Sequence, residues 1–264
     1  MACPGTELLD PDKIKANLKT KRIGQKILVY DSTSSTNDIA AEYAKNKKND
    51  GLVIFAEEQT TGRGRAGSKW HSSRSDSILC SVVLTKNKLS AELLSLTCAV
   101  AVAEAIGKPA KSQAQIKWPN DIILNGKKVA GILLESKTDI GGNIYIVGVG
   151  INCHQKKESF PDELREIATS IDIESNAIVD RISLAKRLLT SIDYWLEMAA
   201  KKSEKVIDRW HNLSVLLGHR VRLVYNSRDF FGNCIGIDPE KGLILQLDTG
   251  GVRMFDAAHT TISK

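Results

Sequence analysis

Residues 117–135 read KWPNDIILNGKKVAGILLE, and this stretch decides the fold. Its Asn125-Gly126 pair lies between two runs of β-type residues, a pattern that strongly predicts a two-residue hairpin. The residue before Pro119 avoids helical backbone, so residues 116–118 are expected to be extended. Gly131 interrupts the second strand, which is typical of a point where backbone or ligand approaches closely. The stretch therefore predicts a pair of buried antiparallel strands entered through a polar turn.

Further strands and helices are expected on both sides of this hairpin. Short apolar runs predict strands at 26–30, 52–56, 78–84 and 143–151, with a turn at Gly141–Asn143 before the last. Apolar residues at helical spacing predict helices at 12–22, 36–46, 90–106, 180–199 and 203–211. Thr36 is expected to cap the second of these helices. Strands and helices in this order indicate an α+β domain.

From Leu217 onward the pattern changes to short strands separated by turn residues. The expected strands are 220–225, 230–238, 242–247 and 252–256. They predict a small β-barrel at 214–264. The preceding residues, 1–213, are expected to form the larger domain, with a short helical leader at its start.

The composition is that of an ordinary globular chain. Its 264 residues are 42% hydrophobic and 26% charged, which is enough to bury a sizeable core. No window approaches ~18 consecutive apolar residues, so no membrane span is expected. The first 15 residues lack the apolar core of a signal peptide. Five cysteines without a CxxC pattern indicate a reduced protein, for which a cytoplasmic location is expected.

A net charge of +6 could indicate nucleic-acid binding, so its distribution matters. Residues 59–75 hold four basic and no acidic side chains, and residues 108–128 hold five basic and one acidic. Such short segments suit a small anionic ligand, for example a nucleotide, better than a long polyanion. Solvated surface loops remain the alternative interpretation.

Residues 62–67, GRGRAG, match the GxGxxG pattern without its usual context. No helix is expected directly after them and no kinase motif accompanies them, which excludes the dinucleotide and kinase readings. Glycines that let a loop approach a ligand, together with Arg63 and Arg65, suit a clamp for carboxylate or phosphate oxygens. An ordinary surface loop and a short RNA-binding segment are the alternatives.

Other candidates have plain structural explanations beside functional ones. Ser35, Thr36 and Asn37 are good capping residues and could also bind a small polar ligand at the helix start. Lys128 follows the hairpin turn and could equally be a surface lysine. The five histidines show no paired ligand spacing, and neither a nucleophile elbow nor a P-loop is present. The sequence therefore favours neither a zinc site nor a covalent enzyme intermediate.

Taken together and in order, these motifs resemble the biotin protein ligases, also called biotin–[acetyl-CoA-carboxylase] ligases. The resemblance covers roughly residues 12–256. It rests on Ser35–Asn37, Gln59 with Gly62–Gly67 and Trp70, Lys117–Asp121, Lys128 with Ala130–Leu133 and Glu135, and Gly148–Asn152. It implies a class II synthetase-like catalytic domain, with a central mixed or antiparallel sheet flanked by helices, and a small C-terminal SH3-like β-barrel. Because only about 30 residues precede the first expected strand, the ligase-only type is expected, without the helix-turn-helix domain that makes some members repressors.

The resemblance also implies a reaction. Biotin and ATP give biotinyl-5′-AMP and pyrophosphate, and a lysine of a biotin carboxyl carrier protein or domain then takes the biotin. ATP and biotin would be the substrates, with Mg²⁺ assisting pyrophosphate departure. The implied partner is the apo carrier, with no nucleic acid and no membrane, and the protein would be a monomer or a homodimer.

Residue roles follow from the same resemblance. The catalytic residues would be Arg63, Arg65 and Lys128. The biotin-binding residues would be Ser35, Thr36, Asn37, Gln59, Arg63, Gly64, Arg65, Lys128, Gly131 and Leu133. The nucleotide-binding residues would be Gly62, Arg63, Gly64, Arg65, Gly67, Trp70, Lys117, Asn120 and Asn152. No metal ligand is assigned. Cations near an acyl-phosphate agree with this chemistry, since negative charge accumulates there during activation.

One segment departs from the family and two rival functions stay open. The last expected strand continues as FDAAH at 255–259, where relatives often carry Gly-Glu, so an ATP contact from that position is left open. A lipoate–protein ligase would share the fold and the adenylation chemistry. A nucleic-acid-binding regulator would instead use the C-terminal barrel, which carries little net charge.

Overall fold

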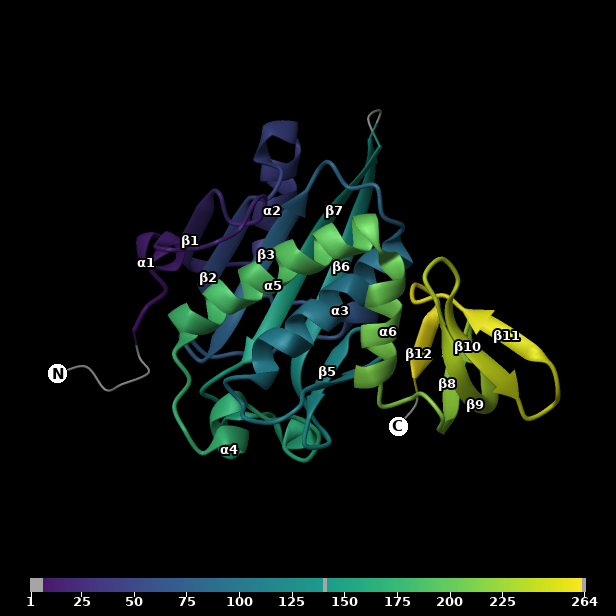
Figure 1. The fold of residues 1–264 in the computed structure, drawn as a ribbon. Coiled ribbons are helices and arrows are strands. Elements are labelled where there is room, and N and C mark those ends of the chain that lie inside the picture. The colour runs from purple at the N-terminus through teal and green to yellow at the C-terminus, as the bar shows by residue number, and fades with distance from the viewer. Residues whose placement is uncertain (1–6, 140–141, 263–264) are drawn as a thin grey trace.

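A computed structural model describes residues 7–139 and 142–262 and contains two β-sheets (Figure 1). The larger sheet has seven strands in the order β1-β2-β3-β7-β6-β5-β4. Its first pair is parallel and its other neighbours are antiparallel, so the predicted mixed sheet is confirmed. The strands are β1 (Ile27–Thr33), β2 (Val53–Gln59), β3 (Ser77–Leu84), β4 (Gln115–Lys117), β5 (Asp121–Leu124), β6 (Lys127–Asp139) and β7 (Gly142–Asn152).

The hairpin that the sequence predicts joins β5 to β6. Asn125 and Gly126 have φ of 48° and 82°, the left-handed backbone that such a turn needs and that Asn and Gly tolerate best. The pairing places Asp121 opposite Gly131. The turn predicted at Gly141–Asn143 lies partly outside the described residues.

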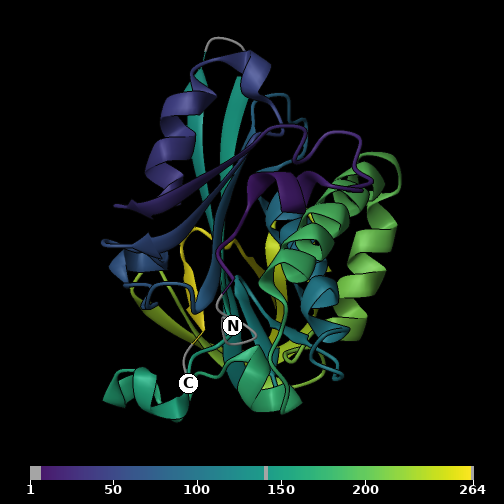
Figure 2. The same cartoon turned by 90° about the vertical axis from the view of Figure 1, so that its left-hand side faces the viewer.

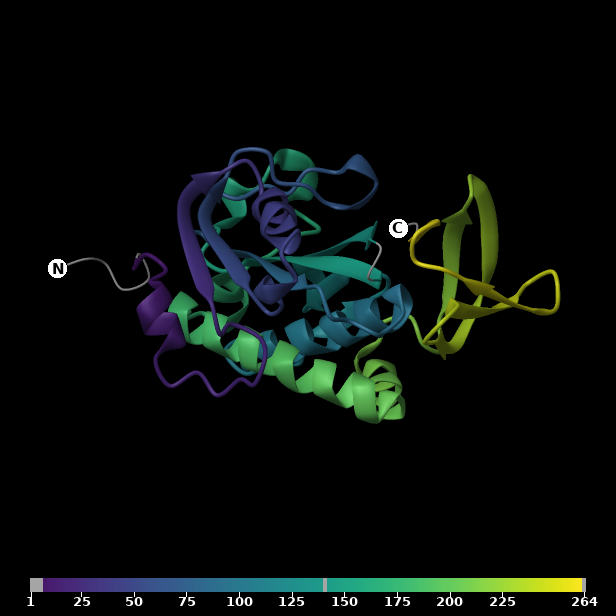
Figure 3. The same cartoon turned by 90° about the horizontal axis from the view of Figure 1, so that it is seen from above.

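Helices cover both faces of the larger sheet (Figures 1, 2 and 3). On one face α3 and α5 pack into the main core. On the other face α2 packs through Ala40 and Ala44 against Ile54 and Val83. The α-helices are α1 (Pro11–Lys15), α2 (Thr36–Ala44), α3 (Ala91–Gly107), α4 (Ile171–Ser175), α5 (Arg181–Lys201) and α6 (Ser203–Leu213). Short 3-10 turns lie at Lys47–Asn49, Arg65–Gly67, Lys157–Ser159 and Asp162–Leu164.

Two helix predictions are wrong in detail. The helix expected at 12–22 ends at Lys15, because Ala16 leaves helical backbone with ψ of 118° and Asn17 then takes a left-handed conformation with φ of 60°. The cap of α2 is Ser35 and not Thr36, since the Ser35 hydroxyl accepts from the Asn37 N–H at 3.3 Å. Thr36 is instead the first helical residue, and its hydroxyl does not cap the helix.

The second sheet has five antiparallel strands in the order β11-β10-β9-β8-β12 and is consistent with the small SH3-like barrel predicted. It lies beside the larger sheet (Figure 3). Its strands are β8 (Arg220–Tyr225), β9 (Arg228–Asp238), β10 (Gly242–Leu247), β11 (Val252–Phe255) and β12 (Thr260–Ile262). The domain boundary between residues 213 and 214 stays a proposal; α6 ends at Leu213, and six residues separate it from β8.

The strand β12 was not predicted. The strand expected at 252–256 ends at Phe255, and residues 256–259, where the sequence reads DAAH, form a turn in which the Asp256 carboxylate accepts from the His259 N–H at 3.0 Å. Across both described segments, no helix combines the length and the apolar composition needed to cross a bilayer.

Candidate functional site

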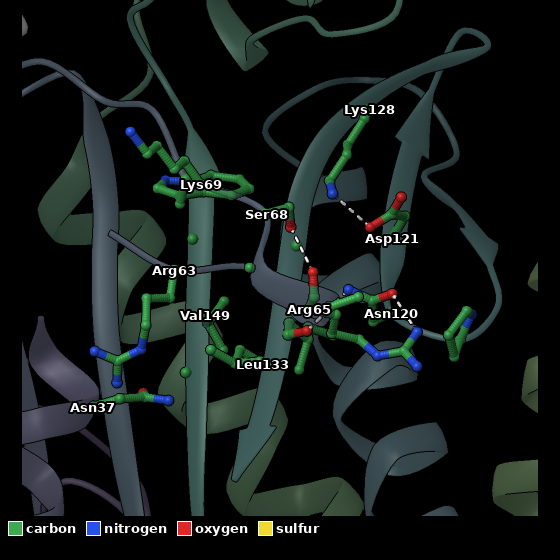
Figure 4. Close-up of a pocket in the computed structure, with 18 of the residues that line it drawn as sticks. Asn37, Arg63, Arg65, Ser68, Lys69, Asn120, Asp121, Lys128, Leu133 and Val149 are labelled. Atoms are coloured by element: carbon green, nitrogen blue, oxygen red, sulfur yellow. Dashed lines mark hydrogen bonds and ion pairs between the residues drawn. The ribbon is translucent and has the colours of Figure 1, made fainter. Parts of the chain in front are cut away.

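Most of the predicted site residues line one cavity of about 220 Å³ above the larger sheet (Figure 4). They come from the start of α2, the end of β2, the glycine loop and the residues that follow it, the 117–121 turn and the strand β6. The predicted residues that line it are Ser35, Thr36, Asn37, Gln59, Arg63, Gly64, Arg65, Trp70, Lys117, Asn120, Lys128, Gly131 and Leu133. Gly62 and Gly67 line the open groove beside it.

One end of the cavity is a network of buried polar side chains. The Thr36 N–H and hydroxyl donate to the Gln59 side-chain oxygen at 2.8 and 3.0 Å. The Ser81 hydroxyl donates to the Asn37 oxygen at 2.5 Å, and the Asn37 amide donates to Glu135 at 2.8 Å. Because each group has a fixed partner, this end presents a preorganised set of donors and acceptors to a small polar ligand.

Glycines on β6 and β7 form the floor and admit two side chains that would otherwise collide with it. A Cβ at Gly148 would lie 2.5 Å from the Asn37 oxygen. A Cβ at Gly150 would lie 2.5 Å from the Trp70 indole, and one at Gly131 would lie 3.0 Å from it. The interruption of the strand by Gly131 therefore marks a close approach, as the sequence predicts.

The other end of the cavity carries lysines. The Lys128 ammonium lies 2.6 Å from Asp121 and 5.8 Å from the centre of the Trp70 ring. Lys117 and Lys69 also line the cavity, and within the described residues neither side chain makes a hydrogen bond or an ion pair. Sequence reasoning missed Lys69, because nothing distinguishes this lysine in the sequence except that it lies in a basic loop. Figure 4 shows Lys128 at the end of the cavity away from Asn37.

The two loop arginines point to different parts of the protein (Figure 4). Arg63 donates to both Asp38 oxygens, at 2.7 and 3.0 Å, and lies 3.5 Å from Glu135. This pairing holds the pKa of Asp38 below its usual range and raises that of Arg63. Arg65 is more buried, which lowers its pKa, and it donates to the Asn120 side-chain oxygen at 3.3 Å.

Arg65 also ties the loop to the C-terminal sheet. Its guanidinium donates to the carbonyl oxygens of Ala257 and of Thr260, the latter at 3.3 Å. The Ala257 N–H in turn donates to Glu92 at the start of α3, at 2.6 Å. Thr261 of β12 lines the cavity itself. These contacts use backbone groups, so no residue type in the sequence could have indicated them.

Asn152 is a predicted site residue that lines neither the cavity nor the groove beside it. Its side chain is buried, donating to the Thr169 carbonyl at 2.9 Å and accepting from Gln155 at 3.3 Å. It lies at the end of β7, where the 169–171 segment covers it. Among residues 7–139 and 142–262, no group of three or more His, Cys, Asp or Glu side chains is placed to hold a metal ion.

The geometry favours an elongated ligand with a polar group at one end and an anion at the other. The amide and hydroxyl network would hold the polar end. The ammonium and guanidinium groups of Lys128, Lys117 and Arg65 would face the anionic end and stabilise negative charge that develops there. The glycine loop, held to α2 and to the C-terminal sheet, would exclude water from this part of the cavity.

Comparisons with known proteins agree on one family. The model of the biotin/lipoate A/B protein ligase family matches residues 29–152. The Bacillus spizizenii protein named bifunctional ligase/repressor BirA is 34% identical, over 94% of this chain and 78% of that protein. The Mycobacterium tuberculosis biotin–[acetyl-CoA-carboxylase] ligase is 30% identical, over 92% of each chain.

The solved structures agree on the fold. The Aquifex aeolicus biotin protein ligase in complex with biotin and ATP superposes with a TM-score of 0.79 at 24% identity. The match covers 91% of this chain and 99% of that one.

Proposed function

The chain belongs to the biotin/lipoate A/B protein ligase family, and on that premise we propose that it activates biotin with ATP and transfers it to a protein lysine. The Mycobacterium tuberculosis relative is named a biotin–[acetyl-CoA-carboxylase] ligase, and it matches 92% of this chain. The observation that carries the proposal is the single cavity that joins the Asn37 network to the Lys128 ammonium.

The polar end of the cavity would hold the biotin ring. The ureido group of biotin has one carbonyl and two N–H groups, which match the hydroxyl and amide atoms around Ser35, Thr36, Asn37 and Gln59. The biotin tail would then run along β6 past Gly131 and Leu133 toward the lysines. This direction places the carboxylate where positive charge collects.

Activation would take place at that carboxylate. One carboxylate oxygen attacks the α-phosphorus of ATP, the bond to the bridging oxygen of the β-phosphate breaks, and pyrophosphate leaves. Lys128 would contact oxygens of the acyl-phosphate, and Arg63 and Arg65 would close the loop over it, so that developing charge meets fixed cations. The carrier lysine amine then attacks the biotinyl carbonyl carbon, AMP leaves, and the amine proton passes to solvent or phosphate.

The nucleotide would lie on the side of the Trp70 ring and the 117–121 turn. Lys117, Lys69 and Asn120 line this side and would contact phosphate oxygens, with the backbone of Gly62, Gly64 and Gly67 allowing close approach. Mg²⁺ would arrive with ATP as part of the substrate, because it is commonly held by phosphates with few protein ligands. This fits a cavity that lacks a carboxylate cluster among the described residues.

The partner proposed is an apo biotin carboxyl carrier domain, and the proposed place of action is the cytoplasm. Cys80, Cys98, Cys153 and Cys234 are buried free thiols, which supports a reducing compartment.

The first half-reaction tests this proposal without a carrier. The protein is incubated with biotin and MgATP, and biotinyl-5′-AMP and pyrophosphate are measured by chromatography. We expect both products in equal amounts, and we expect Lys128→Ala to abolish them. Lys111→Ala, a lysine outside the cavity, is the control and should behave as the unmodified protein. Absence of biotin-dependent pyrophosphate release from the unmodified protein would exclude the proposed function, and rapid turnover of Lys128→Ala would remove Lys128 from the mechanism.

A further inference from the structure

The carboxylates of Asp38 and Glu135 both contact the guanidinium of Arg63 in the glycine loop. Asp38 is in the first turn of α2, directly after Asn37, and Glu135 lies on β6. Asp38 pairs with Arg63 through two hydrogen bonds of 2.7 and 3.0 Å, a bidentate arrangement that fixes the guanidinium plane. We propose that Asp38 and Glu135 are positioning residues, which fix the position of Arg63 relative to Asn37 across the biotin site. This inference rests on the proposed function.

Glu135 is the link between the two ends of this arrangement. One of its oxygens accepts from the Asn37 amide at 2.8 Å, and the other lies 3.5 Å from Arg63. Ser81 fixes the remaining polar atom of Asn37 at 2.5 Å. Because Glu135 contacts both residues, a displacement of Arg63 would also disturb the hydrogen bond that holds Asn37.

The arrangement leaves Arg63 able to contact substrate. A guanidinium carries five N–H donors. Asp38 accepts two of them and Glu135 accepts a third, which leaves two for the oxygens of an acyl-phosphate. Asp38 would therefore act through Arg63 and would not itself contact the reacting atoms.

Fold stability does not explain the Asp38–Arg63 pair. The two side chains are 45% and 40% exposed, and ion pairs this exposed contribute little to folding. The pair also joins a loop to a helix that is already anchored in the core by Ala40 and Ala44. Loss of the pair should therefore change the loop and the site while leaving the unfolding temperature almost unchanged.

The same helix supplies a matched control. Glu42 lies one turn after Asp38, is 67% exposed, and pairs with Lys45, which does not line the cavity. Asp38→Asn and Glu42→Gln each remove one carboxylate charge from α2, but only the first removes a partner of Arg63.

The test compares these two variants with Asp38→Glu and Glu135→Gln. For Asp38→Asn we expect KM for biotin to rise about tenfold and biotinyl-5′-AMP to dissociate faster by a similar factor, because small misplacements of positioning groups are costly. Glu135→Gln should also raise KM for biotin, since the one amide oxygen of Gln cannot replace both carboxylate oxygens that accept from Asn37 and Arg63. Asp38→Glu should restore part of the loss, and Glu42→Gln should match the unmodified protein. All four should unfold at nearly the same temperature.

Hydrogen exchange of the 60–70 segment gives a readout that does not need activity. Asp38→Asn should exchange faster there than Glu42→Gln, because the loop has lost its attachment to α2. Equal exchange and equal KM in these two variants would overturn the inference. Failure of the proposed function is a different result, in which the unmodified protein forms no adenylate although the exchange difference between the variants persists.

Discussion

Replacement of Gly150 by alanine tests the idea that the Trp70 indole packs directly on the backbone of β7 because Gly150 has no Cβ. The added Cβ would lie 2.5 Å from one indole carbon, 2.7 Å from the next and 2.9 Å from the indole nitrogen. Gly150 does not require left-handed backbone, so the strand itself can accept alanine. The substitution therefore acts on the ring and not on the fold of β7.

The size of the effect follows from the contact distances. Carbon atoms pack best at about 3.5 Å, so the ring must retreat by about 1 Å. Overpacking of this kind costs about 1–3 kcal/mol. A shift of about 1 Å in a group that positions substrate can lower kcat/KM by up to about a hundredfold. Gly131→Ala, whose Cβ would lie 3.0 Å from the same ring, should show a smaller loss.

The assay is kcat/KM for ATP in biotin-dependent pyrophosphate release, with the unfolding temperature measured in parallel. We expect a tenfold to hundredfold loss for Gly150→Ala and an intermediate value for Gly131→Ala. In a Trp70→Leu background, Gly150→Ala should add little, because the clash is gone. A Gly150→Ala protein with unchanged kcat/KM for ATP would refute the reasoning.

Three further predictions concern the contacts around the site and the core. Arg65→Ala removes hydrogen bonds to the Ala257 carbonyl and neighbouring groups, so biotinyl-5′-AMP should leak from the enzyme roughly tenfold faster; normal retention with normal transfer would contradict that role. Arg181→Met leaves Glu57, 2% exposed, without its ion-pair partner, and should lower the free energy of unfolding in urea by about 3–5 kcal/mol; a loss below about 1 kcal/mol would show that Glu57 finds another partner. Burial opposes ionisation of Asp50, but hydrogen bonds from Arg22 and from backbone N–H groups hold its pKa below the usual range. The contribution of ionised Asp50 to the free energy of unfolding is therefore fully present above about pH 3.9 and is lost as the pH falls through the lower pKa of the folded state. In Asp50→Asn, the free energy of unfolding should fall less steeply as the pH is lowered than it does in the unmodified protein. An identical pH dependence of the two proteins in acid would contradict this.

Local sequence patterns predicted the parts of the fold that depend on neighbouring residues. The Asn125-Gly126 hairpin formed because its two positions need left-handed backbone that these residues adopt easily. The helix expected at 90–106 is observed as Ala91–Gly107, with Ser90 as its cap. The helix expected at 12–22 is wrong beyond Lys15 because Ala16 and Asn17 leave the helical region, which apolar spacing alone does not reveal.

The site was only partly accessible to sequence reasoning. The residue types around Asn37 and Lys128 suggested a polar ligand and an anion. That these two groups of residues line the same cavity depends on strand register, which the sequence pattern does not give. Asp38 was hidden because an acidic residue in the first turn of a helix is already explained by the helix dipole. The contacts of Arg65 with the C-terminal sheet go to backbone carbonyls, which every residue carries. Asn152 belongs to the same motif as Gly148 and Gly150, yet the segment after Ala168 covers it.

The most direct test of the central claim is acyl transfer to a carrier. The protein is incubated with MgATP, an apo biotin carboxyl carrier domain, and biotin and lipoate in separate reactions, and the carrier lysine is examined by mass spectrometry. The account predicts biotin on that lysine, dependent on ATP, and no lipoate. Lipoylation without biotinylation, or an unmodified carrier in both reactions, would contradict it.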